Sequence, residues 1–224
     1  MDFLNFSEYF NLYFPIIVVS LLCTIAGSYW IDHLYANSLH PDLLSFPEQI
    51  SSRSKFRRPL LFLLLLFCIR RAWAFSNSPA LIYFIIAIVF LCFITMTDFE
   101  QYVIFDAMLL PFAAVGMVYT MHTGLPFTDH ITASLGGGLL FLFLAWISKG
   151  AIGGGDIKLV AALGLWLGSK ALASVILYGA IAGGIAALLL LLLQKTKRKQ
   201  FIAYGPYYTL SAIGVLLKLL RVLF

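Results

Sequence analysis

Charged residues are scarce in this chain of 224 residues: 11% are Asp, Glu, Lys or Arg, whereas 62% are hydrophobic. Ordinary soluble domains carry about 25% charged residues, so the composition excludes a soluble globular protein of the usual kind. Several apolar runs approach the roughly 20 residues that a helix needs to cross a bilayer. We therefore predict an all-α fold and a polytopic integral membrane protein.

Cysteines are also few, and Cys23, Cys68 and Cys92 each lie inside an apolar run. None belongs to a CxxC pair or has a histidine nearby in the sequence, so we expect packing roles and no metal site. A positively charged region is missing ahead of the first apolar run, unlike the start of a secretory signal. We therefore expect residues 12–31 to be a retained membrane anchor.

A basic stripe with interleaved aromatic residues is absent as well, although the net charge is +5. The lysines and arginines gather in a few loops, which is typical of membrane orientation rather than of nucleic-acid binding. We therefore expect contacts with membrane lipids and none with nucleic acid.

The apolar segments follow one another with short polar breaks. We predict a single helical membrane domain over residues 1–224 with about eight transmembrane helices, at residues 12–31, 59–75, 80–97, 107–120, 131–148, 157–167, 171–193 and 205–220. Residues 32–58 form a polar loop whose arginines predict a cytoplasmic position and an outer N-terminus. Arg70 and Arg71 interrupt the second segment, so a helix in the interfacial plane is the alternative for residues 59–75.

Two details of this topology depend on particular residues. Residues 157–167 are short for a span, but the basic cluster at residues 195–199 would lie outside the cell if they did not cross. Three glycines at residues 136–138 would let a neighbouring helix approach the fifth segment closely.

Acidic residues stand out against this background, and Asp156 follows three glycines in the stretch Gly153-Gly154-Gly155-Asp156-Ile157-Lys158. An ionisable group near a bilayer costs about 2.5 to 3.5 kcal/mol on insertion scales, which makes it a candidate for a functional site. The alternative is that Asp156 caps a helix beginning at Ile157.

A second carboxylate, Asp98, is expected on the same side of the membrane. The chain crosses twice between Asp98 and Asp156, so both carboxylates fall at the cytoplasmic face and can meet. Two carboxylates that share a site cannot both ionise easily, and such a pair holds one proton near neutral pH. This is the arrangement of an aspartic protease, in which one member accepts a proton from water and the other donates to the scissile carbonyl oxygen. Asp98 and Asp156 are therefore the candidate catalytic pair, and no cofactor is expected for proteolysis.

Four neighbouring residues are candidates for positioning a substrate. Gly153 and Gly155 lack side chains, which would let an extended peptide approach Asp156. Lys158 could tune Asp156 or set the membrane orientation. Asp106 precedes a helical run, and capping that helix is its expected structural role. Glu100, in contrast, is expected to face the aqueous loop.

The chain resembles the type IV prepilin peptidases, whose pattern is an Asp after one helix, then Ile-Pro-Asp, then Gly-x-Gly-Asp-x-Lys. The matches are Asp98, the triplet Ile104-Phe105-Asp106 with Phe in place of Pro, and residues 153–158. Further matches to the family are Gly27-Ser28-Tyr29, Ser45-Phe46-Pro47 and Tyr204-Gly205-Pro206.

This resemblance implies a membrane aspartic endopeptidase of the bacterial inner membrane, with its active site facing the cytoplasm. Its partners would be prepilin or pseudopilin precursors, cut after a glycine that precedes their hydrophobic segment. Many members also methylate the new N-terminus with S-adenosylmethionine, and many carry zinc-binding cysteines in the first cytoplasmic loop. Residues 32–58 have no cysteine, so that zinc-binding subdomain is not expected, while methylation stays open. The rival hypothesis is a small transporter or proton channel that uses intramembrane aspartates.

Overall fold

The computed structural model describes residues 6–37, 44–74, 80–193 and 203–223, and every regular element in these ranges is helical. The predicted all-α membrane class is confirmed. The α-helices are α1 (Phe6–Ala36), α2 (Ile50–Arg53), α3 (Arg57–Trp73), α4 (Leu81–Gln101), α5 (Asp106–His122), α6 (Phe127–Ile147), α7 (Gly154–Leu192) and α8 (Gly205–Leu223). Single 3₁₀ turns, η2 (Pro47–Gln49) and η3 (Ser54–Phe56), flank α2.

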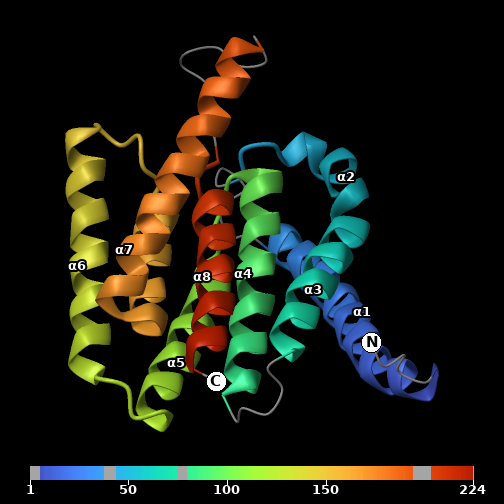
Figure 1. The fold of residues 1–224 in the computed structure, drawn as a ribbon. Helices are drawn as coiled ribbons and strands as arrows, with labels where there is room; N and C mark the ends of the chain where they lie inside the picture. Colours follow the sequence, from blue (N-terminus) through green and yellow to red (C-terminus); the bar gives the residue numbers. More distant parts are fainter. Residues whose placement is uncertain (1–5, 38–43, 75–79, 194–202, 224) are drawn as a thin grey trace.

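Helix α4 lies at the centre of the bundle, between α3 and α8 in Figure 1. It packs against α8, α3, α5 and α1. Its most apolar stretch is 61% buried, compared with 33% or less in the other long apolar helices. The core therefore sits around α4, and the residues at the end of α4 have neighbours on several sides.

Within the described residues, four helices are long and apolar enough to cross a membrane: the stretch Tyr13–Ala36 of α1, and α4, α6 and α7. Helices α3 and α5 have only 17 residues each. The predicted count of eight spans therefore stays a prediction. Residues 59–75, for which an interfacial helix was the alternative to a span, lie mostly in α3, which packs a stripe of buried residues against α1 and α4. Residue 75 lies outside the described residues.

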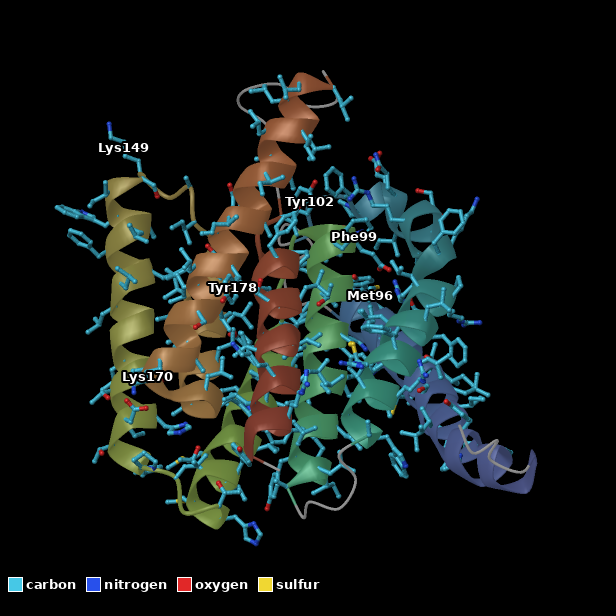
Figure 2. The ribbon with its side chains drawn as sticks, in the orientation of Figure 1. Met96, Phe99, Tyr102, Lys149, Lys170 and Tyr178 are labelled. Carbon is cyan, nitrogen blue, oxygen red and sulfur yellow. The ribbon has the colours of Figure 1, made fainter. Side chains whose placement is uncertain are left out.

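The chain reverses direction inside α7 at Gly168, whose backbone angles are φ 67° and ψ 178°. Side chains from both parts of α7, Val160 before the turn and Leu172 after it, lie beside Gly137 of α6. Figure 2 places Lys170 near the turn and Tyr178 further along the second part. Residues 154–167 and 169–192 are therefore two antiparallel segments, in agreement with the two segments predicted from the sequence.

Close packing of α7 on α6 depends on two of the three glycines of α6. A Cβ at Gly137 would lie 2.8 Å from Leu172 and a Cβ at Gly138 would lie 3.2 Å from Ala161, whereas Gly136 faces open space. The predicted packing role is confirmed for Gly137 and Gly138 and is wrong for Gly136.

The polar loop begins later than predicted, because α1 continues five residues beyond residue 31 to Ala36. The described part of the loop docks on the end of α4. Gln101 accepts a hydrogen bond from the Phe46 backbone N–H at 3.0 Å and donates one to the Phe46 carbonyl at 3.2 Å. The Ser45 N–H donates to the Gln101 carbonyl. The loop and the last turn of α4 are thus fixed to each other.

Candidate active site

Asp98 lies in the last turn of α4, and only 6% of its surface is exposed. The helix ends three residues later because Tyr102 adopts the left-handed conformation, φ 56° and ψ 38°, and donates its N–H to the Asp98 carbonyl. Such a residue commonly terminates a helix. The Asp98 carboxylate atom Oδ2 is buried and finds no hydrogen-bond partner among the residues that the structure describes.

Asp156 is the third residue of α7, which begins at Gly154 with Gly153 as the N-cap. The interpretation of Asp156 as the N-cap of a helix starting at Ile157 is therefore wrong, because the glycines before it join the helix. Its position in the first turn is favourable for a carboxylate, since the helix dipole is positive there. The Asp156 atom Oδ1 is also buried, and no hydrogen bond to it comes from the described part of the chain.

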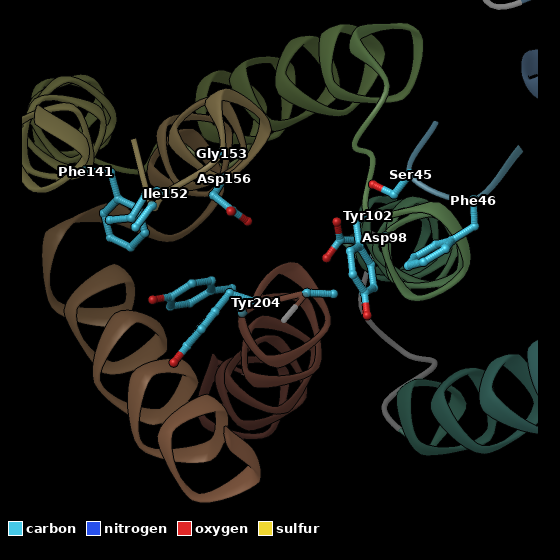
Figure 3. Close-up of a pocket in the computed structure, with 12 residues that line it drawn as sticks. Ser45, Phe46, Asp98, Tyr102, Phe141, Ile152, Gly153, Asp156 and Tyr204 are labelled. Carbon is cyan, nitrogen blue, oxygen red and sulfur yellow. The ribbon is translucent and has the colours of Figure 1, made fainter. Parts of the chain in front are cut away.

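Both carboxylates line one cavity of about 660 Å³. Figure 3 shows Asp98 and Asp156 on opposite sides of this cavity, each pointing toward the other. The remaining walls come from the docked loop, the residue that ends α4, helix α6, the stretch before α7, the two residues before α8, and α8 itself: Ser45, Phe46, Tyr102, Phe141, Ala151, Ile152, Gly153, Ala203, Tyr204 and Tyr208. A smaller cavity of about 380 Å³, between residues 102–106 and 153–158, is also lined by both carboxylates.

A glycine on α8 makes room for Asp98. A Cβ at Gly205 would lie 2.6 Å from Asp98 Oδ2 and 2.9 Å from its Cγ, closer than real Cβ atoms approach other heavy atoms. Gly205 was not among the predicted site residues. The sequence feature that could have identified it is the Tyr204-Gly205-Pro206 motif, which matches the family pattern but does not by itself indicate contact with Asp98.

The glycines before Asp156 differ in their surroundings. Gly153 lines both cavities, and Gly154 faces open space. A Cβ at Gly155 would lie 3.0 Å from Ile104. Gly155 therefore lets the loop after α4 pack against the start of α7, while Gly153 is the glycine that borders the larger cavity.

Lys158 and Asp106 form an ion pair with each other: Lys158 Nζ lies 2.8 Å from Asp106 Oδ1 and 2.7 Å from Oδ2. Both side chains are 58% exposed, and both residues line the smaller cavity. Asp106 is the first residue of α5, and Phe105 is the N-cap, so the predicted capping role of Asp106 is wrong. The pair links the start of α5 to the first turn of α7, beside Asp156.

Glu100 is buried, and the expectation that it faces the aqueous loop is wrong. Only 3% of its surface is exposed, and its carboxylate lies against the Arg57 guanidinium, with Arg57 Nη2 2.6 Å from Glu100 Oε2. The Tyr35 hydroxyl donates to the same oxygen at 3.1 Å. A buried glutamate is rare unless it is paired, and here its partners come from α1 and α3.

The arrangement can hold and move a proton between two carboxylates. Each has a buried oxygen without a protein partner, and the two face one cavity, so a water molecule or a peptide carbonyl that enters would find both an acceptor and a donor. Where two carboxylates share one site, ionisation of both is disfavoured and a single proton is favoured.

The fold and this cavity define a helical membrane protein with paired carboxylates at the ends of two helices. Residues 85–188 match the sequence model of the Type IV leader peptidase family. The family resemblance predicted from the motifs is confirmed over this part of the chain, which contains Asp98, Asp106 and residues 153–158.

Individual relatives agree with the family match. The chain is 32% identical over 124 residues to the prepilin leader peptidase/N-methyltransferase of Aeromonas salmonicida, covering 53% of this chain and 43% of that protein. It is 31% identical over 146 residues to the protein of the same name from Neisseria gonorrhoeae, covering 62% and 50%. The chain thus spans about half the length of the curated relatives it matches. No solved structure matches the chain.

Proposed function

We propose that this chain is a membrane aspartic endopeptidase with Asp98 and Asp156 as its catalytic pair. Its substrates would be prepilin-like or pseudopilin precursors, cut after the glycine that ends their leader peptide. The observation that carries this proposal is the meeting of two carboxylates, each with an unpaired buried oxygen, in one cavity. The names of the relatives supply the substrate class.

The reaction follows from the shared proton. The ionised carboxylate accepts a proton from water as the water oxygen bonds to the scissile carbonyl carbon, while the protonated carboxylate donates to the carbonyl oxygen. As the tetrahedral intermediate collapses, one of its two hydroxyls returns a proton to the second carboxylate, the carbon–nitrogen bond breaks, and the proton taken from water passes to the leaving amine. The pair is then singly protonated again. Gly153, at the wall of the cavity, leaves space for the backbone of an extended peptide.

The proposed location is the bacterial inner membrane, with the cavity at the cytoplasmic face. Support comes from the basic residues at the same end of the bundle as the carboxylates, including Arg53 and Lys55 in the docked loop, Arg58 at the start of α3 and Lys158 near Asp156. Cytoplasmic loops carry an excess of such residues.

Methyl transfer to the new N-terminus is a second candidate activity, favoured by an adjacent cavity. This cavity of about 610 Å³ shares Tyr102 and Ala203 with the catalytic cavity, and Arg53 lies in its wall. Its volume lies within the range of about 300 to 1,000 Å³ that is typical of small-molecule sites, and Arg53 and Glu100 are the charged residues in its mostly apolar wall. Arg53 would hold the carboxylate of S-adenosylmethionine, which when bound supplies a methyl group to an amine. Weighing the products formed from a prepilin-like peptide with and without S-adenosylmethionine separates methylation from cleavage.

The experiment that tests the peptidase is co-expression of the chain with a prepilin-like precursor. Asp98→Asn and Asp156→Asn should each abolish processing, while Glu48→Gln, which alters an exposed acid in the loop, should leave it intact. Full cleavage by either Asp variant would reject the catalytic pair. Flux of protons or solute through liposomes that depends on Asp156 and is indifferent to precursor would favour the transporter instead.

A further inference from the structure

A buried ionic cluster lies behind Asp98, on the far side of α4 from the cavity. The Arg57 Nε donates to Glu100 Oε1 at 2.8 Å and Oε2 at 3.0 Å, and its Nη2 donates to Oε2 at 2.6 Å. The Arg57 Nη1 contacts Asp32 Oδ1 and the Ser28 carbonyl. Tyr35 completes the cluster through its hydroxyl. Three helices, α1, α3 and α4, therefore meet at one guanidinium.

Stability alone does not account for this cluster. The side chains of Arg57 and Glu100 are 2% and 3% exposed, so both charges have lost most of their hydration. A buried ion pair of this kind is often no more stabilising than well-packed apolar residues of similar volume. The best-attested use of buried ionic groups is to select one arrangement of packed elements over its alternatives.

The helical geometry of α4 indicates which arrangement the ionic cluster selects, namely the rotation of the last turn of α4. Successive helical residues are about 100° apart, so Glu100 points to the side of α4 opposite Asp98. Arg57 therefore holds the last turn of α4 from behind, while Asp98 in front faces Asp156 and Gly205. A rotation of that turn by about 20° would move a carboxylate roughly 5 Å from the helix axis by about 2 Å.

The docked loop reinforces the same turn. Arg53 donates to the Glu100 carbonyl at 3.0 Å, and its guanidinium stacks 3.5 Å above the Phe46 ring centroid. Gln101 binds both backbone groups of Phe46. Since Arg57 is the first residue after this loop, its ion pair joins the loop and the helix at a second point.

We propose that Arg57 and Glu100 are positioning residues, which fix the rotation of the end of α4 and thereby aim Asp98 at Asp156. The proposal rests on the peptidase function above. It predicts that the ion pair acts on the chemical step, because misplacing a catalytic group by about 1 Å can slow a reaction about 100-fold without changing how the substrate binds.

The decisive comparison is Arg57→Lys with Arg58→Lys in purified full-length protein, using a prepilin-like peptide. Lysine keeps the charge but loses the planar fork that binds both Glu100 oxygens, whereas Arg58 is exposed and serves as the matched control. We expect kcat per folded protein to fall at least 10-fold for Arg57→Lys, with KM within twofold, and both constants to stay unchanged for Arg58→Lys. A kcat within twofold of the control would overturn the proposal.

A double variant distinguishes a positioning role of the Arg57–Glu100 pair from a role in stability alone. Arg57→Met and Glu100→Leu should each lower the melting temperature. The first leaves the buried Glu100 carboxylate without its guanidinium, and the second leaves the buried Arg57 with Asp32 as its remaining carboxylate partner. The combination Arg57→Met/Glu100→Leu should recover the melting temperature while kcat stays at least 10-fold low. Recovery of kcat together with stability would show that the pair is only structural and would refute the proposal.

The Asp variants test the peptidase function, whereas the Arg57 and Glu100 variants test the positioning role. If Asp98→Asn or Asp156→Asn still cleaves, the catalytic pair itself is wrong. If both are inactive but the Arg57 and Glu100 variants retain full kcat, the peptidase stands and only the positioning role is lost.

Discussion

Replacing Gly205 with alanine should disable Asp98 without unfolding the protein. The added Cβ would lie 2.6 Å from Asp98 Oδ2, about 0.8 Å inside the 3.4 Å at which ordinary contact begins, and 2.9 Å from the carboxyl carbon. Either the carboxylate turns aside or α8 moves away from α4. Both responses change the position of Asp98 relative to Asp156.

The magnitude follows from that displacement. A misplacement of about 1 Å costs up to about 100-fold in rate, so we expect kcat of Gly205→Ala to fall roughly 30- to 100-fold, equivalent to about 2 to 3 kcal/mol in the activation free energy. Stability should change little, because the atoms met by the new Cβ belong to the end of the Asp98 side chain, which can turn aside and relieve the contact.

The assay is steady-state cleavage of a prepilin-like peptide by purified protein in lipid nanodiscs, with thermal unfolding measured on the same samples. Gly214→Ala is the matched control, because Gly214 lies in the same helix and a Cβ there meets nothing within 4 Å. We expect the control to keep its full kcat. If Gly205→Ala cleaves as fast as Gly214→Ala while Asp98→Asn is inactive, the contact between Gly205 and Asp98 does not matter for catalysis.

Three further changes test the fold and the site. Gly168→Ala places a side chain at φ 67° and ψ 178°, a glycine-only region, so thermal unfolding should show a loss of about 1 to 3 kcal/mol. Gly164→Ala would put a Cβ 2.4 Å from backbone atoms of α6 and should lower the melting temperature by overpacking. Gly136 faces open space, so Gly136→Ala should leave the melting temperature unchanged. Equal losses of melting temperature in Gly164→Ala and Gly136→Ala would contradict the packing of α7 on α6. Lys158→Met breaks an exposed ion pair with Asp106 and should cost less than about 1 kcal/mol in unfolding experiments; a larger loss would mean that the pair is shielded from water.

Composition and hydropathy were enough to predict the helical class and the approximate position of each long segment, because an apolar run in a chain of this kind has few other folds available. The reversal inside α7 was also predictable, although its pivot Gly168 was not named. The count of membrane crossings predicted that Asp98 and Asp156 lie on the same side and can meet, and the structure places both on one cavity.

Side-chain partners were harder to predict, because they come from distant parts of the sequence. Glu100 was expected in water since its neighbours in the sequence gave no reason for burial, but its partner Arg57 lies 43 positions earlier. Asp106 was interpreted as a helix cap from local preference alone. Its side chain pairs instead with Lys158, 52 positions later. Local propensity contains no information on which helices become neighbours.

We expect the reversal of α7 at Gly168 to affect the surrounding lipid as well. The part before the turn, residues 154–167, has 14 residues, which at about 1.5 Å of rise each span roughly 21 Å, against a hydrocarbon core of about 30 Å. A membrane accommodates such hydrophobic mismatch by thinning. We therefore expect the bilayer to be thinnest beside the start of α7, where the headgroup region and its water come nearest to Asp156. Short-chain lipids should suit this protein better than long-chain ones.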